Sequence, residues 1–451
     1  MGNTIIHRKP ERLYYTRLFF LFIALFFSGK SMAVNVVEFS LVNGMRVIIK
    51  EDHRFPIAIS QIWYKVGSID EYEGITGISH ALEHMMFNGT KKVQAGQFSH
   101  MIAEKGGRDN AFTSNDFTAY YVILPKEHIS LAFELEADRM IDLDMQQESF
   151  TQEMKVVAEE RRLRTDDNPN SQVYESLFKN AFSKDYPLHH PVIGWMRDIE
   201  KMKLNDLKDW YKRWYSPNNA ILVVVGDVNP AELKSTIEKN FVHVKKRKIE
   251  QRIRAKDTLA PGKFISVEAN AEVPYLMLGY KIPSFRKLSY FHKWELYALE
   301  MLAQILDGGK SSRFYKNLIR GKRIAASTDA SSSIFSYYPG LFVIDGTPRE
   351  GFSTTELQAA IQIEIEKVQK YLVSEKELSL VKAQLVASEI YQRDSIKHQA
   401  TLIGMLETNE IGWQMMDQYI RNLERVTAEQ IRKVAQKYLT PANLTTVVLD
   451  I

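Results

Sequence analysis

The chain has 451 residues, of which 45% are apolar and 25% charged, a composition that excludes a disordered or fibrous protein. Its length exceeds what a single hydrophobic core usually organises and predicts about two to four domains. The absence of cysteine excludes disulfides, thiolate metal ligands and a cysteine nucleophile.

The formal net charge of +4 comes from the first 33 residues, where five basic residues stand against one acidic residue. The rest of the chain therefore has equal numbers of acidic and basic residues. A neutral body gives no basis for a polyanion partner, and we expect no nucleic-acid binding.

Residues 1–33 have the order of a secretory signal peptide. A basic stretch precedes the apolar run 18–27, and the small residues Ser31 and Ala33 follow, which predicts cleavage after Ala33. The apolar run is shorter than the roughly 20 residues of a membrane-spanning helix. We therefore expect an exported protein, in a bacterial periplasm, with an uncleaved membrane anchor as the alternative.

The segments that follow mix strands and helices without regular alternation, which favours the α+β class. Alternating apolar residues around the Asn43-Gly44 turn predict a β-hairpin over 36–49. Further strands are predicted at 58–66, 113–124 and 220–226, and helices at 78–87, 95–105, 132–143, 152–164 and 204–215.

The motif His80-Ala81-Leu82-Glu83-His84 falls on the first of these helices. His80 and His84 are one turn apart on one face, where two neutral imidazoles can bind one Zn²⁺. Glu83 is adjacent and can take a proton from water. The order is the inverse of the common H-E-x-x-H motif of zinc peptidases. On these five residues alone, a solvated helix face is the alternative interpretation.

A catalytic zinc site usually has three protein ligands, so one more is expected elsewhere. Glu153 and Glu160 lie seven residues apart, about two helical turns, and therefore project from one stripe of a helix. One of them could bind the metal while the other orients a histidine or the attacking water. A salt-bridged surface is the alternative, because Arg161 and Arg162 follow directly.

Lys245-Lys246-Arg247-Lys248, together with Arg252 and Arg254, forms a basic run between two halves of similar length. A polyanion patch is one interpretation, but no aromatic residues interleave with these charges. We interpret the run as a solvated linker between domains.

The second half resembles a diverged copy of the first. Residues 210–219 and the apolar strand after them recur from residue 434, at an offset of 224 positions. At an offset of 217, the motif falls on Tyr297-Ala298-Leu299-Glu300-Met301, which keeps Ala-Leu-Glu and replaces both histidines.

The proposed third ligand is lost in the same half as the histidines. At the offset of 224, Glu153 falls on Glu377, but Glu160 falls on Gln384. A real set of ligands predicts this correlated loss, so we expect the metal in the first half only.

The motif, followed after 75 residues by Glu160, resembles the pitrilysin/insulinase superfamily of inverted-motif zinc metallopeptidases. Gly77, the segment 87–90 and the segment 106–114 match as well. The resemblance covers about residues 34–451 and is strongest to the mitochondrial-processing-peptidase-like branch and its bacterial relatives. It implies an α+β fold of two homologous mixed α/β-sheet domains that enclose a peptide-binding chamber.

The domains expected on this basis follow the chain in order. They are the signal peptide 1–33, a catalytic zinc-binding domain 34–244, a basic linker 245–258 and a homologous domain without metal, 259–451.

The resemblance also implies roles for single residues. One Zn²⁺ per chain would be held by His80, His84 and Glu160. Glu83 would be the catalytic general base, and Glu153 the carboxylate that supports a ligand.

Substrate binding is expected from Asn110, Ala111 and Phe112, which the resemblance places on an edge strand. Such an edge offers unpaired N–H and C=O groups to an extended peptide. A plain turn that enters a strand is the alternative for Asn110.

One departure from the family pattern concerns the second half. Active relatives usually place an arginine and then a tyrosine near the substrate carbonyl. Arg320 matches the arginine and is expected to bind substrate, although a solvated charge at a helix end is the alternative. Ala326 or Ser327 stands at the tyrosine position. A homologous partner subunit could supply the missing group, so we expect a homodimer or a heterodimer.

The sequence thus predicts a zinc metalloendopeptidase that cleaves peptides or unfolded polypeptide segments by means of zinc-activated water. A non-catalytic scaffold or peptide-binding subunit of a heteromeric complex is the main alternative. A non-proteolytic zinc amidohydrolase fits the metal ligands but not the edge-strand match.

Overall fold

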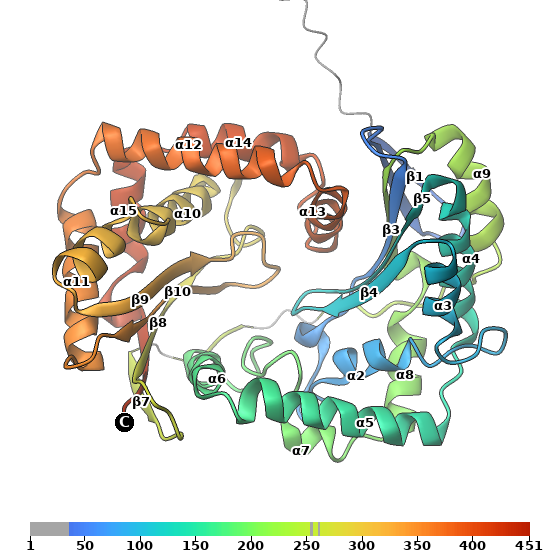
Figure 1. The fold of residues 1–451 in the computed structure, drawn as a ribbon, viewed down its shortest axis with the longest axis horizontal. Helices are drawn as coiled ribbons and strands as arrows, with labels where there is room; N and C mark the ends of the chain where they lie inside the picture. Colours follow the sequence, from blue (N-terminus) through green and yellow to red (C-terminus); the bar gives the residue numbers. More distant parts are fainter. Residues whose placement is uncertain (1–35, 253–255, 260–261) are drawn as a thin grey trace, which may run out of the picture. The chain divides into compact units, whose positions relative to one another are not determined.

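The computed structural model describes residues 36–252, 256–259 and 262–451 (Figure 1). The expected signal peptide, residues 1–33, lies outside the described residues, as does Arg254 of the basic run. Within the described part of the chain, no helix is long and apolar enough to cross a membrane.

The first half of the chain forms a six-stranded sheet. Its strands are β1 (Val36–Ser40), β2 (Arg46–Glu51), β3 (Ile57–Tyr64), β4 (Arg108–Thr113), β5 (Thr118–Pro125) and β6 (Ala220–Gly226). They are hydrogen-bonded in the order β1-β2-β6-β3-β5-β4. β4 is therefore the edge strand of this sheet, as the resemblance implies for residues 110–112.

The single strand predicted over 113–124 is wrong at its beginning. Thr113 ends β4, a turn follows, and β5 begins at Thr118. The backbone N–H of Ser114 donates to the carbonyl of Phe117 across this turn, at 2.8 Å. The predicted range thus joined the end of one strand to the whole of its hairpin partner.

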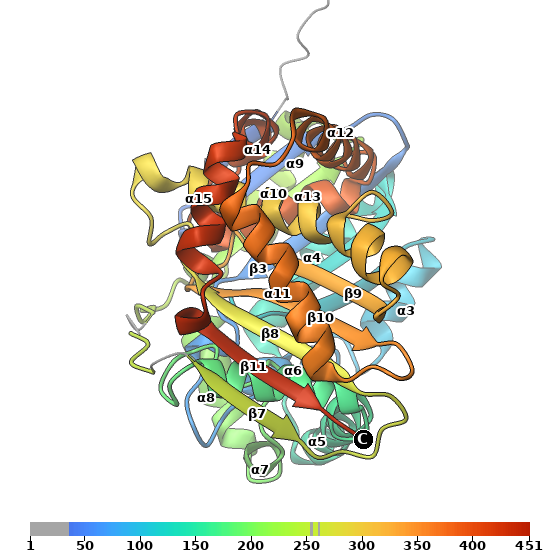
Figure 2. The same ribbon diagram turned by 90° about the vertical axis from the view of Figure 1, so that its left-hand side faces the viewer.

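The second half forms a five-stranded sheet. Its strands are β7 (Lys263–Val267), β8 (Tyr275–Ile282), β9 (Ala325–Ser332), β10 (Gly340–Pro348) and β11 (Leu444–Leu449). They are hydrogen-bonded in the order β7-β11-β8-β10-β9, and Figure 2 shows β11 between β7 and β8.

Helices cover the sheets of both halves. In the first half they are α2 (Ile78–Met85), α3 (Gln97–Glu104), α4 (Ile129–Asp142), α5 (Gln147–Arg161), α6 (Pro169–Ala181), α7 (Met196–Ile199), α8 (Leu204–Trp214) and α9 (Pro230–Phe241). In the second half they are α10 (Trp294–Asp307), α11 (Thr354–Lys370), α12 (Glu375–Gln392), α13 (Ile396–Thr408), α14 (Met415–Glu424) and α15 (Ala428–Tyr438). The α+β class is thereby confirmed.

Apart from β1, the two sheets share one topology, which supports the internal duplication. β2 pairs in parallel with β6, which pairs antiparallel with β3. In the same way, β7 pairs in parallel with β11, which pairs antiparallel with β8. α8 and β6 recur as α15 and β11 at the offset of 224, so the repeat in the sequence is a repeat in the fold.

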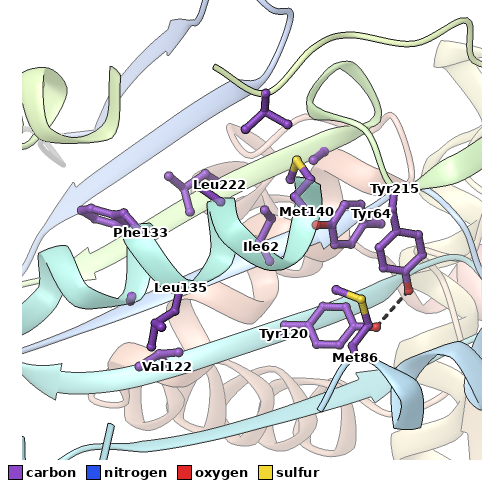
Figure 3. Close-up of a cluster of buried hydrophobic side chains, with 14 of the residues drawn as sticks. Ile62, Tyr64, Met86, Tyr120, Val122, Phe133, Leu135, Met140, Tyr215 and Leu222 are labelled. Atoms are coloured by element: carbon purple, nitrogen blue, oxygen red, sulfur yellow. Dashed lines mark hydrogen bonds between the residues drawn. The ribbon is translucent and has the colours of Figure 1, made fainter. Parts of the chain in front are cut away.

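A core between the first sheet and its helices fixes the position of the motif helix (Figure 3). Ile62 and Tyr64 alternate with Trp63 along β3, and only the former two face this core. The hydroxyls of Tyr120 and Tyr215 share a hydrogen bond of 2.9 Å inside it. Aromatic residues that bury both ring and hydroxyl in this way favour one arrangement of the strands and helices around them.

Each sheet is also contacted by a helix from the other half of the chain. α13 packs on β3 and β6, where Gln61 donates to the hydroxyl of Thr401 at 3.1 Å. α6 packs on β8 and β11, where Val173 and Leu177 join the apolar cluster that contains Val447. The two halves therefore complete each other's sheet faces.

The basic run is less solvated than predicted. Its described residues form neither helix nor strand, as a linker should. However, the Arg252 side chain is only 8% exposed, and its Nε lies 3.0 Å from Asp70 Oδ1. The Arg247 guanidinium donates to the carbonyls of Tyr211 and Tyr215. These arginines anchor the segment to the first half instead of leaving it free in water.

Candidate metal centre

The motif helix α2 has a fixed beginning. Gly77 precedes it with a φ of 87°, and a Cβ there would lie 2.3 Å from the carbonyl oxygen of Ile193. Only glycine fits such a position. Glu71 accepts the backbone N–H groups of Gly77 and Ser79 at 2.6 and 2.9 Å, and so satisfies two donors that a helix N-terminus leaves free.

α2 turns its apolar side into the core and its motif side toward α5. Leu82 and Met85 are fully buried in the core, while His84 reaches Glu153 and Glu160 on α5. α5 begins at Gln147, five residues before the predicted start, and continues into a π-helical turn, Arg162–Asp166. Both glutamates therefore lie on α5, Glu153 in its middle and Glu160 in its last turn.

The structure brings the three predicted metal ligands together. Glu160 Oε2 lies 3.7 Å from His80 Nε2 and 3.3 Å from His84 Nε2. One donor atom from each of His80, His84 and Glu160 lies within 4.8 Å of the other two. Glu153 approaches from the other side of the ring, with its Oε2 3.2 Å from His84 Nδ1.

The donor set fits a zinc ion. Two imidazoles and one carboxylate form a ligand set of known catalytic zinc sites, and the distances of 3.3 and 3.7 Å are below twice a bond length of about 2.1 Å. Burial, with the charge of His84, lowers the pKa of His80 to about 4. His80 is therefore neutral at ordinary pH, the form that binds a metal.

The pKa of His84 is shifted in the opposite direction to that of His80. Burial opposes its protonation, but the hydrogen bond to Glu153 and the charge of Glu160 outweigh burial and raise its pKa. A proton on Nδ1 that faces Glu153 leaves Nε2 on the side of Glu160. Carboxylates orient metal-binding histidines in this way.

Glu83 lies beside these ligands and accepts a hydrogen bond from the Thr113 hydroxyl at the end of β4. Burial raises the pKa of the Glu83 carboxyl, although this hydrogen bond works in the opposite direction. A carboxylate with a raised pKa in a cavity is suited to general-base chemistry.

The centre opens into a cavity of about 730 Å³, which is large enough for several side chains of a peptide. Asn110, Ala111 and Phe112 line it together with the three ligands, Glu83 and Glu153. The Phe112 ring packs edge-on against Trp63, with 5.4 Å between ring centroids, which holds this part of β4 in place.

Several residues of the site were missed in the sequence. Thr113 and Arg164 both line the cavity, as do Val192 and Ile193. Arg164 Nη1 lies 2.5 Å from Glu160 Oε1, and its position four residues after that glutamate is a signal that the sequence contains. Val192 and Ile193 are distant in sequence and carry no such signal.

Arg320 is not brought to this site. It is exposed in the π-helical segment Tyr315–Gly321 and is not among the residues that line the cavity. Ala326 and Ser327 lie on β9 and do not line it either. In the part of the chain that the structure describes, no residue of the second half lines this cavity.

The corresponding position in the second half has different chemistry. Tyr297 and Met301 are buried where the first half has its histidines. Glu377, the counterpart of Glu153, forms an ion pair with Arg313 at 2.8 Å. Among the described residues, the only cluster suited to a metal is that of the first half.

Known proteins are similar to this chain over nearly its whole length. A family model described as Insulinase (Peptidase family M16) matches residues 46–194, and one described as Peptidase M16 inactive domain matches residues 201–385. The zinc protease PqqE of Helicobacter pylori is 32% identical over 422 residues, 91% of each chain.

Solved structures agree with the fold. The crystal structure of a protease from Helicobacter pylori matches with a TM-score of 0.86 and 29% identity, over 92% of this chain and 99% of that one. The first half of the periplasmic protease PqqL from Escherichia coli matches with a TM-score of 0.75 and 21% identity, over 92% and 91% of the two chains.

Proposed function

The chain belongs to the M16 (insulinase) family of peptidases, and on this basis we propose that it is a zinc-dependent metalloendopeptidase that cleaves peptides or unfolded polypeptide segments. The observation that carries the proposal is the convergence of His80, His84 and Glu160, with Glu83 lining the same cavity. The name of the relative PqqE, a zinc protease, supports it.

In this proposal, His80, His84 and Glu160 hold one Zn²⁺, and Glu153 keeps the His84 ring in position. The zinc ion supplies Lewis acidity, which makes water more acidic and polarises a carbonyl. His80 contributes a neutral ring because its pKa is low, so binding at this residue displaces no proton.

Glu83 moves the protons of the reaction. Its carboxylate takes one proton from the water that attacks the scissile carbonyl and passes it to the amine that leaves. The Thr113 hydroxyl orients this carboxylate, and the balance is the addition of one water across one peptide bond.

The substrate segment would bind as an added strand along β4. Asn110, Ala111 and Phe112 lie on this edge, and β4 pairs with β5 on its other side only. Strand addition needs a main chain free of its own hydrogen bonds, which is why peptides and unfolded segments are the expected substrates.

A homologous partner, a second copy or a related subunit, would complete the site, because neither Arg320 nor the position of Ala326 lines the cavity. The predicted signal peptide supports action after export, in the periplasm.

The proposal is tested with the purified chain and Glu83→Gln. We expect about one zinc per chain in both proteins and hydrolysis of an unstructured peptide by the parent only. Glu160→Gln should lose both zinc and hydrolysis. Glu159→Gln is the matched control, because Glu159 is the next residue on α5, is exposed and pairs with Arg162.

The outcomes separate the alternatives. A chain that binds no zinc and cleaves nothing, alone or with a homologous chain added, would be a scaffold or peptide-binding subunit. Hydrolysis that appears only after a homologous chain is added would show a site shared between subunits. Unchanged hydrolysis by Glu83→Gln would remove Glu83 from the mechanism.

A further inference from the structure

Arg252, in the segment between the two halves, is buried beside the turn that follows β4. Its side chain is 8% exposed, and its Nε lies 3.0 Å from Oδ1 of Asp70, whose side chain is 2% exposed. Its Nη2 donates to the backbone carbonyl of Asp116, in the turn between β4 and β5. None of these three residues lines the metal cavity, so they take no direct part in the proposed reaction.

The Arg252 guanidinium joins two loops of the first half, residues 67–71 and the turn 114–117. The two loops are also bonded to each other, because the backbone N–H of Ile69 donates to the carbonyl of Asn115 at 3.0 Å. A charged group that is shielded from water is costly to separate from its hydrogen-bond partners. Arg252 therefore holds the two loops in one relative position.

Each loop leads directly to part of the candidate metal centre. The turn begins immediately after Thr113, the last residue of β4, whose hydroxyl donates to the carboxylate of Glu83. Residues 110–112, which line the cavity, precede Thr113 on the same strand. The other loop ends at Glu71, which accepts N–H groups at the beginning of α2. The position of Arg252 therefore bears on β4 through the turn and on the start of α2 through Glu71.

The second half of the chain contacts the same turn. The backbone N–H of Tyr337 donates to Asp116 Oδ2 at 3.2 Å, and the centroid of the Tyr337 ring lies 4.7 Å from the guanidinium carbon of Arg252. Tyr337 is fixed in its own half, because Arg286 packs on its ring at 3.9 Å and the Ser284 hydroxyl donates to its carbonyl at 3.1 Å. The second half, none of whose described residues lines the cavity, thus reaches β4 through this turn.

The two turns that meet here are equivalent in the repeat. β8, β10 and β9 follow one another in the second sheet as β3, β5 and β4 do in the first. Tyr337 lies between β9 and β10, as Asp116 lies between β4 and β5. The contact therefore joins corresponding hairpins of the two halves. Arg252, from the segment that links the halves, bonds to one hairpin and stacks on the other.

We infer that Arg252 is a positioning residue for substrate, which holds the turn after β4 so that this strand presents a fixed edge. The inference rests on the proposed function, in which the substrate segment adds to β4 as a strand. An edge that is already held in the binding conformation avoids the entropy cost of ordering it when the substrate binds. The described contacts of Arg252 do not include the three candidate metal ligands, so its loss should weaken substrate binding and leave zinc binding intact.

Arg252→Met in the full chain tests the inference, with Arg247→Met as the matched control. Arg247 belongs to the same segment and also donates to backbone carbonyls, those of Tyr211 and Tyr215, but its described hydrogen bonds go to neither of the two loops. Arg252→Lys keeps the charge without the planar fork and should have a smaller effect. Asp70→Asn added to Arg252→Met removes the acid that the single variant leaves buried and unpaired, so this double variant decides if the single variant does not fold.

Substrate binding is measured on zinc-loaded protein that also carries Glu83→Gln, by titration with a fluorescent unstructured peptide. Arg252→Met should weaken peptide binding about tenfold or more, Arg252→Lys less than that, and Arg247→Met less than about twofold. The zinc affinity, from competition with a chelator, should be that of the parent in every variant. Parent-like peptide binding by folded Arg252→Met or by the double variant would overturn the inference, and so would an equal loss in Arg247→Met.

Hydrogen exchange separates failure of this inference from failure of the proposed function. Without substrate, the amides of β4 and of the turn after it should exchange about tenfold faster in Arg252→Met than in the parent, while those of β6 in the same sheet stay unchanged. If the parent neither binds zinc nor cleaves peptides, the proposed function fails, and this comparison still decides whether Arg252 holds β4. Unchanged exchange at β4 would overturn the inference.

Discussion

His84 Nδ1 and Glu153 Oε2 lie 3.2 Å apart, and this contact joins the motif helix α2 to α5. It orients the imidazole so that Nε2 faces Glu160, 3.3 Å away. Glu153 thus positions one residue of the candidate metal site without being one of its three converging donors.

Replacing Glu153 by alanine should weaken zinc binding and activity by about 10- to 100-fold, since partners of this kind fix a histidine ligand in its productive orientation. Competition with a zinc chelator measures the affinity. The exposed neighbour Glu159→Ala should change neither quantity. If Glu153→Ala retained the parent's zinc affinity, the contact would have no role in metal binding.

The carboxyl group of Glu71 makes the free energy of unfolding depend on pH. Burial raises the pKa of this carboxyl to about 8, above its value of 4.5 when unfolded. The folded chain therefore binds a proton that the unfolded chain releases, so this residue's contribution to the free energy of unfolding falls as pH rises from about 5 to about 8.

Glu71→Gln removes this titration but keeps one acceptor oxygen of the two that receive the N–H groups of Gly77 and Ser79. Relative to the variant, the parent should lose stability across that range, as measured by urea midpoints at several pH values. Glu148→Gln makes the same substitution at an exposed position, and its urea midpoints should change with pH as those of the parent do. A constant difference between the parent and Glu71→Gln would contradict the assignment.

Gly404 on α13 lies directly against Trp63 of the first sheet. A Cβ at this position would lie 2.0 Å from Trp63 Cε2. Alanine normally stabilises a helix interior relative to glycine by about 1 kcal/mol, but here it overpacks the contact, and we expect a net loss of about 1–3 kcal/mol.

A double mutant separates the two effects. In a Trp63→Leu background, which removes the ring that clashes, Gly404→Ala should cost less or become stabilising. Chemical denaturation gives the four free energies of unfolding. Equal costs in both backgrounds would show that Trp63 is not the cause.

Removal of the metal should lower the thermal midpoint as well as the activity, because an ion that binds only the folded chain stabilises it by mass action. A chelator should lower the thermal midpoints of the parent and of Glu83→Gln by the same amount. Stoichiometric zinc should restore both midpoints. His80→Ala should already melt at the lower temperature and should not respond to the chelator. A shift of equal size in His80→Ala would place the relevant ion elsewhere.

The sequence predicted the cluster of His80, His84 and Glu160 more completely than the strands around it. Spacings of four and seven residues suffice for His80, His84, Glu153 and Glu160, because helical periodicity alone determines which side chains share a face. The boundary between β4 and β5 was missed although Ser114, Asn115 and Asp116, residues typical of turns, stand between the two strands.

Contacts between segments that are distant in the sequence could not be predicted from any local pattern of residues. The burial of Arg252 on Asp70 looks like solvated charge in the sequence, and nothing in α6 or α13 indicates which sheet each one covers. Such contacts depend on the path of the whole chain, which no single window of sequence contains.

Because α6 and α13 each pack on the sheet of the other half, neither half of the chain can be lost in evolution without exposing apolar surface on the half that remains. A truncation that removed the second half would also remove α13, and Trp63, which is fully buried, would meet water. Loss of the first half would similarly uncover the apolar residues of β8 and β11 under α6. Inheritance of the second half is thus tied to that of the first, since each sheet loses one of its covering helices when the other half is removed.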